Sequence, residues 1–133
     1  MLRKRKGFTL IELMIVIAII AILAAILVPN FIKARAQGQL TACKSNEKNQ
    51  ATALEMYATD NNGRYPNTMT GTEFSGNYMK TLPTCPASAA FYSYSRNSTP
   101  DAYTMWCSGA SAHTAVGLGT SSPYYDNAQG LKP

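Results

Sequence analysis

The sequence predicts an α+β fold, in which a long N-terminal helix packs on a small antiparallel β-sheet. Three patterns predict it: an apolar stretch over residues 8–28, an amphipathic helical pattern over residues 30–63, and alternating aromatic and small residues after residue 90. The chain of 133 residues has the length of one domain. Because 46% of its residues are hydrophobic and 14% are charged, a wholly disordered chain is excluded.

Residues 8–28 have the length and composition of a membrane-spanning helix. One charged residue, Glu12, interrupts them, and at about 1.5 Å per residue they extend about 30 Å, the thickness of the hydrocarbon core of a bilayer. A core helix of a soluble domain should have a polar face, which this stretch lacks.

Positive charge is concentrated before this stretch. The formal net charge is +5, and Arg3, Lys4, Arg5 and Lys6 supply four of the positive charges. The rest of the chain is nearly neutral, which does not support a basic nucleic-acid-binding surface, and we expect no specific nucleic-acid partner. The basic residues instead predict a cytoplasmic N-terminus and export of the chain beyond Pro29.

A cleaved secretory signal is the alternative interpretation of this N-terminus. Ala34-Arg35-Ala36 offers a small-residue cleavage pattern after the apolar stretch. However, the stretch is longer than the ~7–15 apolar residues usual in a signal, and Lys33 and Arg35 crowd the cleavage pattern. Both features favour a retained membrane helix.

A second helical segment continues beyond Pro29. Apolar or small residues recur there at steps of three and four as far as residue 58, with Glu47 as a polar residue on the same stripe. Asp60-Asn61-Asn62-Gly63 predicts the end of the helix, with Gly63 in a left-handed conformation. Pro29 and Gly38 are the predicted kink points. Such a helix exceeds what a small domain can bury, so we expect copies of the same protein to cover its apolar half.

Glu12 is the residue of greatest interest in the apolar stretch. A carboxylate inside a membrane helix costs about 2.5–3.5 kcal/mol on insertion scales, and the span contains no basic partner for it. Glu12 could instead lie near the interface, hydrated or protonated. Cleavage between Gly7 and Phe8 would create an α-amino group that could neutralise Glu12, on the same chain or on a neighbour. Such a pair would set the register between packed helices, because a shifted neighbour leaves both charges unpaired.

Arg5-Lys6-Gly7, followed by Phe8-Thr9-Leu10-Ile11-Glu12, resembles the prepilin leader and cleavage box of type IV pilins and type II secretion pseudopilins. Val28-Pro29-Asn30 is similar to the end of the apolar run in that family. The resemblance implies that a prepilin peptidase cuts after Gly7, that Phe8 becomes the N-methylated first residue, and that Glu12 pairs with the N-terminus of a neighbour. It also implies a homo-oligomeric filament, assembled by inner-membrane platform and ATPase machinery.

Later motifs are similar to the major pseudopilin of type II secretion, although a type IV pilin remains an alternative. They are Leu54-Glu55-Met56-Tyr57, Arg64-Tyr65-Pro66 and the run from Tyr78 to Pro86. Where the family usually has Asp-Pro, this chain has Cys85-Pro86. The acidic calcium loop of the family has no clear counterpart, because no acidic residue lies between Asp101 and Asp126. We expect no cofactor and no metal, with calcium as the remaining option.

The residues that follow the helix predict a small sheet. Residues 91–96 alternate aromatic and small side chains, residues 97–101 form a dense turn signal, and residues 102–107 read as the returning strand. Residues 114–118 are a candidate third strand. The predicted organisation is a cleaved leader (1–7), a transmembrane and polymerisation segment (8–29), an amphipathic helical segment (30–63) and an exported globular domain (64–133).

Three cysteines in an exported chain suggest one disulfide and one remaining thiol. The favoured pair is Cys85 with Cys107, which would close a loop worth about 3 kcal/mol in the chain-entropy description. Cys43 is either a buried thiol on the helical stripe or an alternative partner for one of the other two.

The sequence does not favour an enzyme. His113 is the single histidine, six residues after Cys107, and we interpret it as an ordinary loop or strand residue rather than the base of a nucleophilic pair. Neither a phosphate-binding glycine loop nor a zinc-type spacing is present. The prediction is a structural subunit of a membrane-rooted filament. A single-pass anchor that presents a small binding module, such as a minor pilin, an adhesin or a DNA-uptake receptor, is the alternative.

Overall fold

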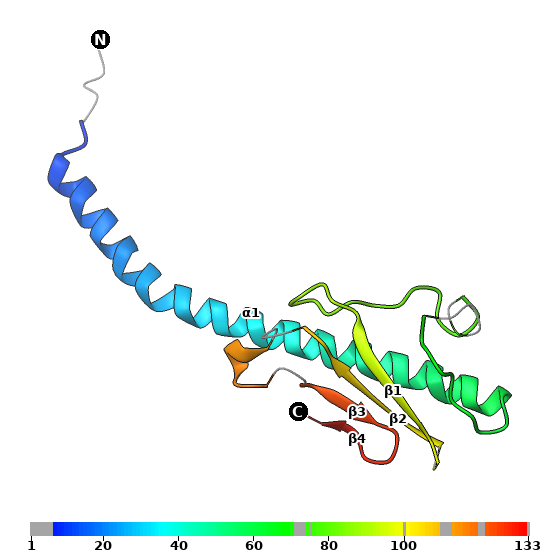
Figure 1. Ribbon diagram of the computed structural model, residues 1–133. Helices are drawn as coiled ribbons and strands as arrows, with labels where there is room; N and C mark the ends of the chain where they lie inside the picture. Colours follow the sequence, from blue (N-terminus) through cyan, green and yellow to red (C-terminus); the bar gives the residue numbers. More distant parts are fainter. Residues whose placement is uncertain are drawn as a thin grey trace, which may run out of the picture. The chain divides into compact units, whose positions relative to one another are not determined.

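The computed structural model describes residues 7–70, 74, 76–99, 101–109, 113–119 and 122–132. It has the predicted α+β architecture: one long helix followed by an antiparallel sheet (Figure 1). The elements in chain order are α1 (Leu10–Asp60), β1 (Tyr92–Ser98), β2 (Asp101–Cys107), the 3-10 helix η1 (Thr114–Val116), β3 (Tyr124–Asp126) and β4 (Gly130–Lys132). Two compact units divide the chain, Met1–Ala34 and Arg35–Pro133, and α1 contributes residues to both.

In the first unit, α1 is exposed on every side. It is long and apolar enough to cross a membrane, with a mean hydropathy of 3.2 over its most apolar window and no buried residue there. Pro29 lies inside the helix without ending it. The predicted membrane-spanning segment is therefore a helix that makes no core of its own.

In the second unit, one face of α1 is buried. Its buried residues are Leu40, Cys43, Glu47, Gln50, Ala51, Ala53, Leu54 and Ala58. These positions confirm the predicted stripe from Leu40 onward, including the polar residue Glu47 on it, whereas the helix has no buried residue between Pro29 and Leu40. The helix ends with Asn62 and Gly63 both at positive φ, 56° and 80°, and the Gly63 N–H donates to the Ala58 carbonyl at 2.7 Å. The left-handed conformation expected at Gly63 is thus confirmed and is shared with Asn62.

The sheet has the strand order β1-β2-β3-β4, and every neighbouring pair is antiparallel. The β1–β2 hairpin is long, running from the pair Tyr92 and Cys107 to the pair Ser98 and Asp101. It confirms the two strands predicted from the alternating pattern. The β2–β3 and β3–β4 pairings are each three residues long.

The third strand predicted at residues 114–118 is wrong. Thr114–Val116 form η1 instead, which Gly117 ends in a left-handed conformation at φ 80°. The actual outer strands, β3 and β4, are too short for an alternating pattern to identify them, because three residues include at most two on one face.

The core lies where α1 covers one face of the sheet. Ala51, Leu54 and Ala58 of the helix pack in one cluster with Tyr103 and Met105 of β2. Residues after the helix complete the cluster: Tyr65, Met69 and Phe74. A small sheet of this kind is not stable alone, and the helix supplies the apolar cover that it needs.

Candidate functional site

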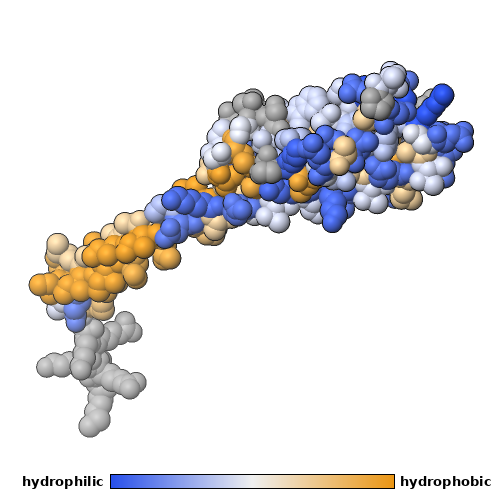
Figure 2. Space-filling view, turned by 90° about the horizontal axis from the view of Figure 1, so that it is seen from below, coloured by the Kyte–Doolittle hydropathy of each residue, from blue (hydrophilic) through white to orange (hydrophobic). Residues whose placement is uncertain are grey.

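The first candidate site is the exposed apolar surface of α1 in the first unit. Figure 2 shows hydrophobic side chains gathered along this part of the helix, while hydrophilic side chains dominate the visible face of the sheet unit. The large exposed apolar residues between Leu10 and Ile32 are Ile11, Leu13, Met14, Ile15, Val16, Ile17, Ile19, Ile20, Ile22, Leu23, Ile26, Leu27, Val28 and Phe31. A contiguous apolar surface of this extent requires lipid or partner helices to cover it.

The helix begins with a capping box that joins Thr9 and Glu12. The backbone N–H and the hydroxyl of Thr9 donate to Glu12 Oε2 at 2.8 and 2.6 Å, and the Glu12 N–H donates back to Thr9 Oγ1 at 3.3 Å. Glu12 therefore has a local partner that the sequence analysis missed. The signal was present as Thr9-x-x-Glu12 ahead of an apolar run, which is a typical capping-box pattern.

The predicted cleavage position lies just outside this helix. Gly7 and Phe8 precede Leu10 in non-helical, exposed backbone, a conformation that a peptidase can engage. At the other end of the span, the Asn30 side chain donates to the Ile26 carbonyl at 3.1 Å, one residue after Pro29. The kink at Pro29 stays a prediction.

The second candidate site is a buried cluster of Cys43, Cys85, Cys107 and His113 in the second unit. The four side chains are 0%, 1%, 1% and 2% exposed. One sulfur or ring nitrogen from each lies within 4.8 Å of those of the others, and Cys85 Sγ lies 3.6 Å from His113 Nε2. His113 is thus fully buried, which the sequence analysis did not anticipate.

All three cysteines of this cluster are free thiols. The structure brings Cys85 and Cys107 together, as the predicted disulfide requires, but it places Cys43 in the same cluster. The Cys85–Cys107 bridge therefore stays a prediction, with Cys43 as the alternative partner.

The three thiols have different acidities. Burial raises the pKa of Cys43 far above its usual value and that of Cys107 to about 11. Burial acts on Cys85 in the same direction, but hydrogen bonds from Ser88, from the Ala87 backbone and from Cys107 outweigh it and lower the pKa of Cys85. Cys85 is therefore the most acidic thiol of the three.

Glu47 lies one helical turn after Cys43 and is fully buried. Neither of its carboxylate oxygens has a hydrogen-bond partner among the described residues. Burial, followed by the neighbouring Cys85, raises the pKa of Glu47 to about 8. A buried carboxylate without partners is costly and indicates that a charge or proton is needed at this place.

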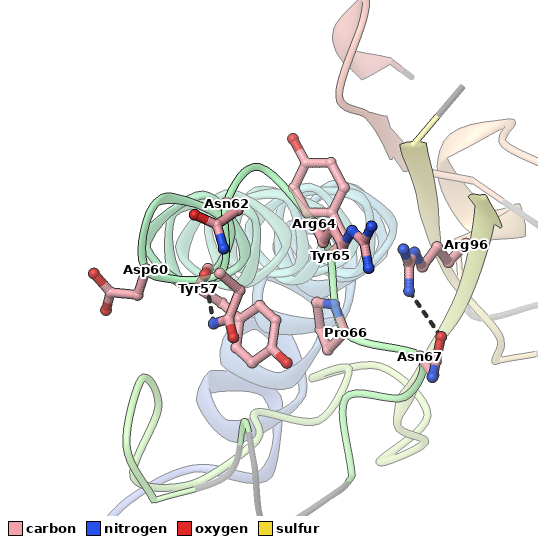
Figure 3. A pocket seen from close by; sticks show the side chains of 9 residues that line it. Tyr57, Asp60, Asn62, Arg64, Tyr65, Pro66, Asn67 and Arg96 are labelled. Carbon is pink, nitrogen blue, oxygen red and sulfur yellow. Dashed lines mark hydrogen bonds between the residues drawn. The ribbon is translucent and has the colours of Figure 1, made fainter. Parts of the chain in front are cut away.

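A third feature is an open pocket of about 580 Å³ at the C-terminal end of α1. Asp60 and Arg96 lie on opposite sides of it, and the Arg96 guanidinium donates to Asn67 at 2.8 Å (Figure 3). Asp60 accepts a hydrogen bond from Tyr78 at 3.0 Å. Asp60, Asn67 and Arg96 at its rim thus each have a hydrogen-bond partner within the protein.

Asp101 and Asp126, the acidic residues considered as calcium ligands, interact with different partners. Asp101 forms an ion pair with Arg96 at 2.7 Å, and Asp126 accepts from the Ala128 N–H at 2.8 Å. Within the described part of the chain, the one group with metal-ligand geometry is the cysteine–histidine cluster. Calcium stays an untested option.

Comparison with known proteins decides the family. The profile of the prokaryotic N-terminal methylation motif matches residues 2–28. Type II secretion system core protein G of Pseudomonas aeruginosa is 39% identical over 99 residues, covering 63% of this chain and 69% of that protein. The type IV wide pilus major component PilA4 of Thermus thermophilus is 52% identical over 61 residues, covering 46% of this chain and 47% of that protein. The type IV major pilin protein PilA of Myxococcus xanthus is 54% identical over 54 residues, which are 41% of this chain and 24% of that protein. No solved structure matches the chain.

The chain belongs to the type IV pilin and type II secretion pseudopilin family. This confirms the resemblance carried by residues 5–12, and the relatives are structural subunits rather than enzymes.

Proposed function

We propose that this pilin-family chain is a pseudopilin-type filament subunit. After prepilin peptidase cuts between Gly7 and Phe8 and Phe8 is N-methylated, the apolar part of α1 holds the subunit in the inner membrane. Copies of the chain then pack through this part of α1 into a membrane-rooted filament, with the platform and ATPase machinery of that system. The observation that carries the proposal is the wholly exposed apolar surface of α1, which a single chain leaves without cover.

The extent of sequence similarity supports the pseudopilin branch. The match to core protein G covers 63% of the chain, which is more than residues 1–60 can supply, so it reaches beyond α1. The matches to the two pilins cover 46% and 41% of the chain, which is about the length of the leader and helix together. Loss of protein secretion on deletion of the chain would support this branch, whereas loss of surface pili with intact secretion would assign the chain to a type IV pilus.

The basic residues before the span support a cytoplasmic N-terminus and a sheet unit on the outer side of the inner membrane. Protease added to spheroplasts should digest the sheet unit of newly inserted subunits. Protection of that unit until the membrane is dissolved would reverse the orientation.

Glu12 is proposed to set the register of assembly. Thr9 satisfies one carboxylate oxygen through hydrogen bonds, but hydrogen bonds do not cancel the negative charge. The α-amino group that cleavage creates at Phe8 is a cation at the same depth on every subunit. Pairing Glu12 with Phe8 of a neighbour removes both charges from lipid, and this is possible only between chains in the correct register.

Two variants separate the charge of Glu12 from its capping role. Glu12→Gln keeps the capping-box geometry, because glutamine also serves at this position, and removes only the charge. Thr9→Val removes the hydroxyl and keeps the charge. We expect Glu12→Gln to be inserted and cleaved but not assembled, and Thr9→Val to assemble into filaments with a slightly less stable helix start.

Cleavage and methylation should be measured from the mass of the N-terminal peptide. Assembly should be measured by shearing filaments from cells or by cross-linking between subunits. Normal filaments from Glu12→Gln would refute the register role. Filaments from Glu12→Gln together with failure of Thr9→Val after normal cleavage would assign Glu12 to helix capping alone. A purified protein that stays monomeric in lipid would instead support the single-pass binding module.

A further inference from the structure

We propose that Cys43, Cys85, Cys107 and His113 form a structural zinc site that fastens α1 to the sheet. The four ligand atoms lie within 4.8 Å of one another. Around a tetrahedral Zn²⁺ with Zn–S of about 2.3 Å and Zn–N of about 2.0–2.1 Å, a sulfur and a nitrogen are about 3.6 Å apart. The distance from Cys85 Sγ to His113 Nε2 is 3.6 Å. A ligand set of three cysteines and one histidine is typical of structural zinc sites.

The four ligands come from four separate segments of the second unit. Cys43 lies in α1, Cys85 follows the bridge between Thr84 and Phe91, Cys107 ends β2 and His113 precedes η1. An ion held by all four would cross-link the helix, a loop, the sheet and the 3-10 helix. Because all four side chains are buried, the site has no open position for a substrate, which indicates a structural rather than a catalytic ion.

Hydrogen-bond donors surround the sulfur atoms. Hydrogen bonds from the backbone of Ala87 and Ser88 act to lower the pKa of Cys85, and one from the Gly109 backbone acts in the same direction on the pKa of Cys107. The Tyr92 hydroxyl lies 3.3 Å from the Cys43 sulfur. Donors directed at sulfur favour thiolates over thiols, and such outer contacts are what orients and tunes the ligands of metal sites.

The side chains at the cluster could also supply negative charge to a bound cation. Three thiol groups and the carboxyl group of Glu47 are buried together, and Cys43, Cys85 and Glu47 act electrostatically on one another. The oxygens of Glu47 have no hydrogen-bond partner among the described residues. A buried divalent ion would offset the negative charge of the thiolates that form when it binds.

Zn²⁺ is the ion that the ligand chemistry favours. Soft thiolates with one imidazole in a tetrahedral arrangement select zinc over magnesium or calcium, which prefer oxygen ligands. The site cannot be recognised from the sequence, because the ligands are 42, 22 and 6 residues apart and form no short Cys-x-x-Cys element. A Cys85–Cys107 disulfide would exclude this ion, so the two states are distinguishable.

The test uses the full-length chain in detergent micelles, purified without added metal. We expect about one zinc per chain by elemental analysis, and thiols that react with a thiol reagent only after chelation or unfolding. Replacing the zinc with Co²⁺ should give visible absorption bands of tetrahedral thiolate coordination. These measurements need no variant. A metal-free chain that fails to give the cobalt bands after reduction, or a native chain with a Cys85–Cys107 disulfide, would overturn the proposal.

Variants locate the ion. Cys43→Ser removes one ligand and should lower zinc affinity at least tenfold, with a weaker cobalt–thiolate band. Ala51→Ser is the matched control, because it also places a hydroxyl at a buried position on the same face of α1, and it should keep the metal. Equal zinc binding by both variants would place the ion elsewhere. If Cys43→Ser does not fold, His113→Ala replaces it in the test, and loss of the imidazole ligand should shift the cobalt bands.

Discussion

Tyr103 in β2 donates a hydrogen bond to Glu55 in α1, with 3.3 Å between the hydroxyl oxygen and Oε1. Tyr65, in the segment after the helix, donates to the same carboxylate at 3.0–3.1 Å, and its ring meets that of Tyr103 edge-on at 4.7 Å. One acidic side chain therefore joins the helix, the following loop and the sheet. This arrangement holds the sheet in place over α1.

Removing the Tyr103 hydroxyl should weaken this junction. We expect Tyr103→Phe to lower the free energy of unfolding by about 1 kcal/mol, because Glu55 loses one hydrogen bond but keeps that from Tyr65. Tyr124→Phe is the control, since Tyr124 lies on β3, where Lys132 contacts its ring rather than its hydroxyl. It should change stability by less than about 0.5 kcal/mol. Denaturant unfolding measures both, and equal effects would contradict a specific role for the Tyr103 hydroxyl.

The ion pair at the tip of the hairpin predicts a pH dependence. Arg96 holds Asp101 through two hydrogen bonds of 2.8 and 2.7 Å, and these lower the pKa of Asp101 below its usual value. The unfolded chain then binds a proton at higher pH than the folded chain does. The contribution of Asp101 to stability is therefore present at neutral pH and is lost as the pH falls below about 4.

Two variants should weaken this dependence of stability on pH in the acid range. Asp101→Asn removes the titrating group, and Arg96→Gln removes the cation that lowers its pKa. Unfolding midpoints measured from pH 6 downward should fall less steeply in both variants than in the unchanged chain. If the unfolding midpoint of Arg96→Gln falls with pH as steeply as that of the unchanged chain, another carboxyl group causes the loss of stability.

Pro29 should weaken α1 locally. It has no N–H for the helical hydrogen bond to residue 25, and a proline in a helix interior costs about 3 kcal/mol. Pro29→Ala should therefore slow amide hydrogen exchange around residues 26–33 in micelles. Gly38→Ala is the comparison, with an expected gain of about 1 kcal/mol, because a Cβ at Gly38 meets no atom within 4 Å. An unchanged rate of amide exchange in Pro29→Ala would contradict the predicted local weakening of α1 at Pro29.

Metal-free chain should oxidise in one preferred way. Cys107 donates a hydrogen bond to the Cys85 sulfur, and Cys85 has the lowered pKa of the three thiols. With the metal chelated and diamide as the oxidant, Cys85 and Cys107 should each lose one proton and one electron and form the disulfide, while Cys43 stays a thiol. Mass mapping identifies the bridge, and Cys43→Ser should form the same one. A bridge that contains Cys43 would contradict this order of reactivity.

Local patterns were sufficient where the structure is local. The apolar run, the stripe with Glu47, the helix end at Gly63 and the β1–β2 hairpin depend on neighbouring residues and on periodicity, and the sequence predicted each of them. The capping box of Thr9 and Glu12 was also readable, because its two residues are three positions apart. By contrast, the strand predicted at residues 114–118 failed, since a short apolar run fits a 3-10 turn as well as a strand.

The sequence by itself determined that the chain carries one long helix with an uncovered apolar half, and therefore what class of protein it is. The meeting of Cys43, Cys85, Cys107 and His113 was decided only by the tertiary structure. Their contacts join residues up to 70 positions apart in the chain. The periodicity of a helix does not predict which loop will pack against which of its faces. The packing of α1 on the sheet brings these side chains together, and the chemistry of the cluster follows from that packing.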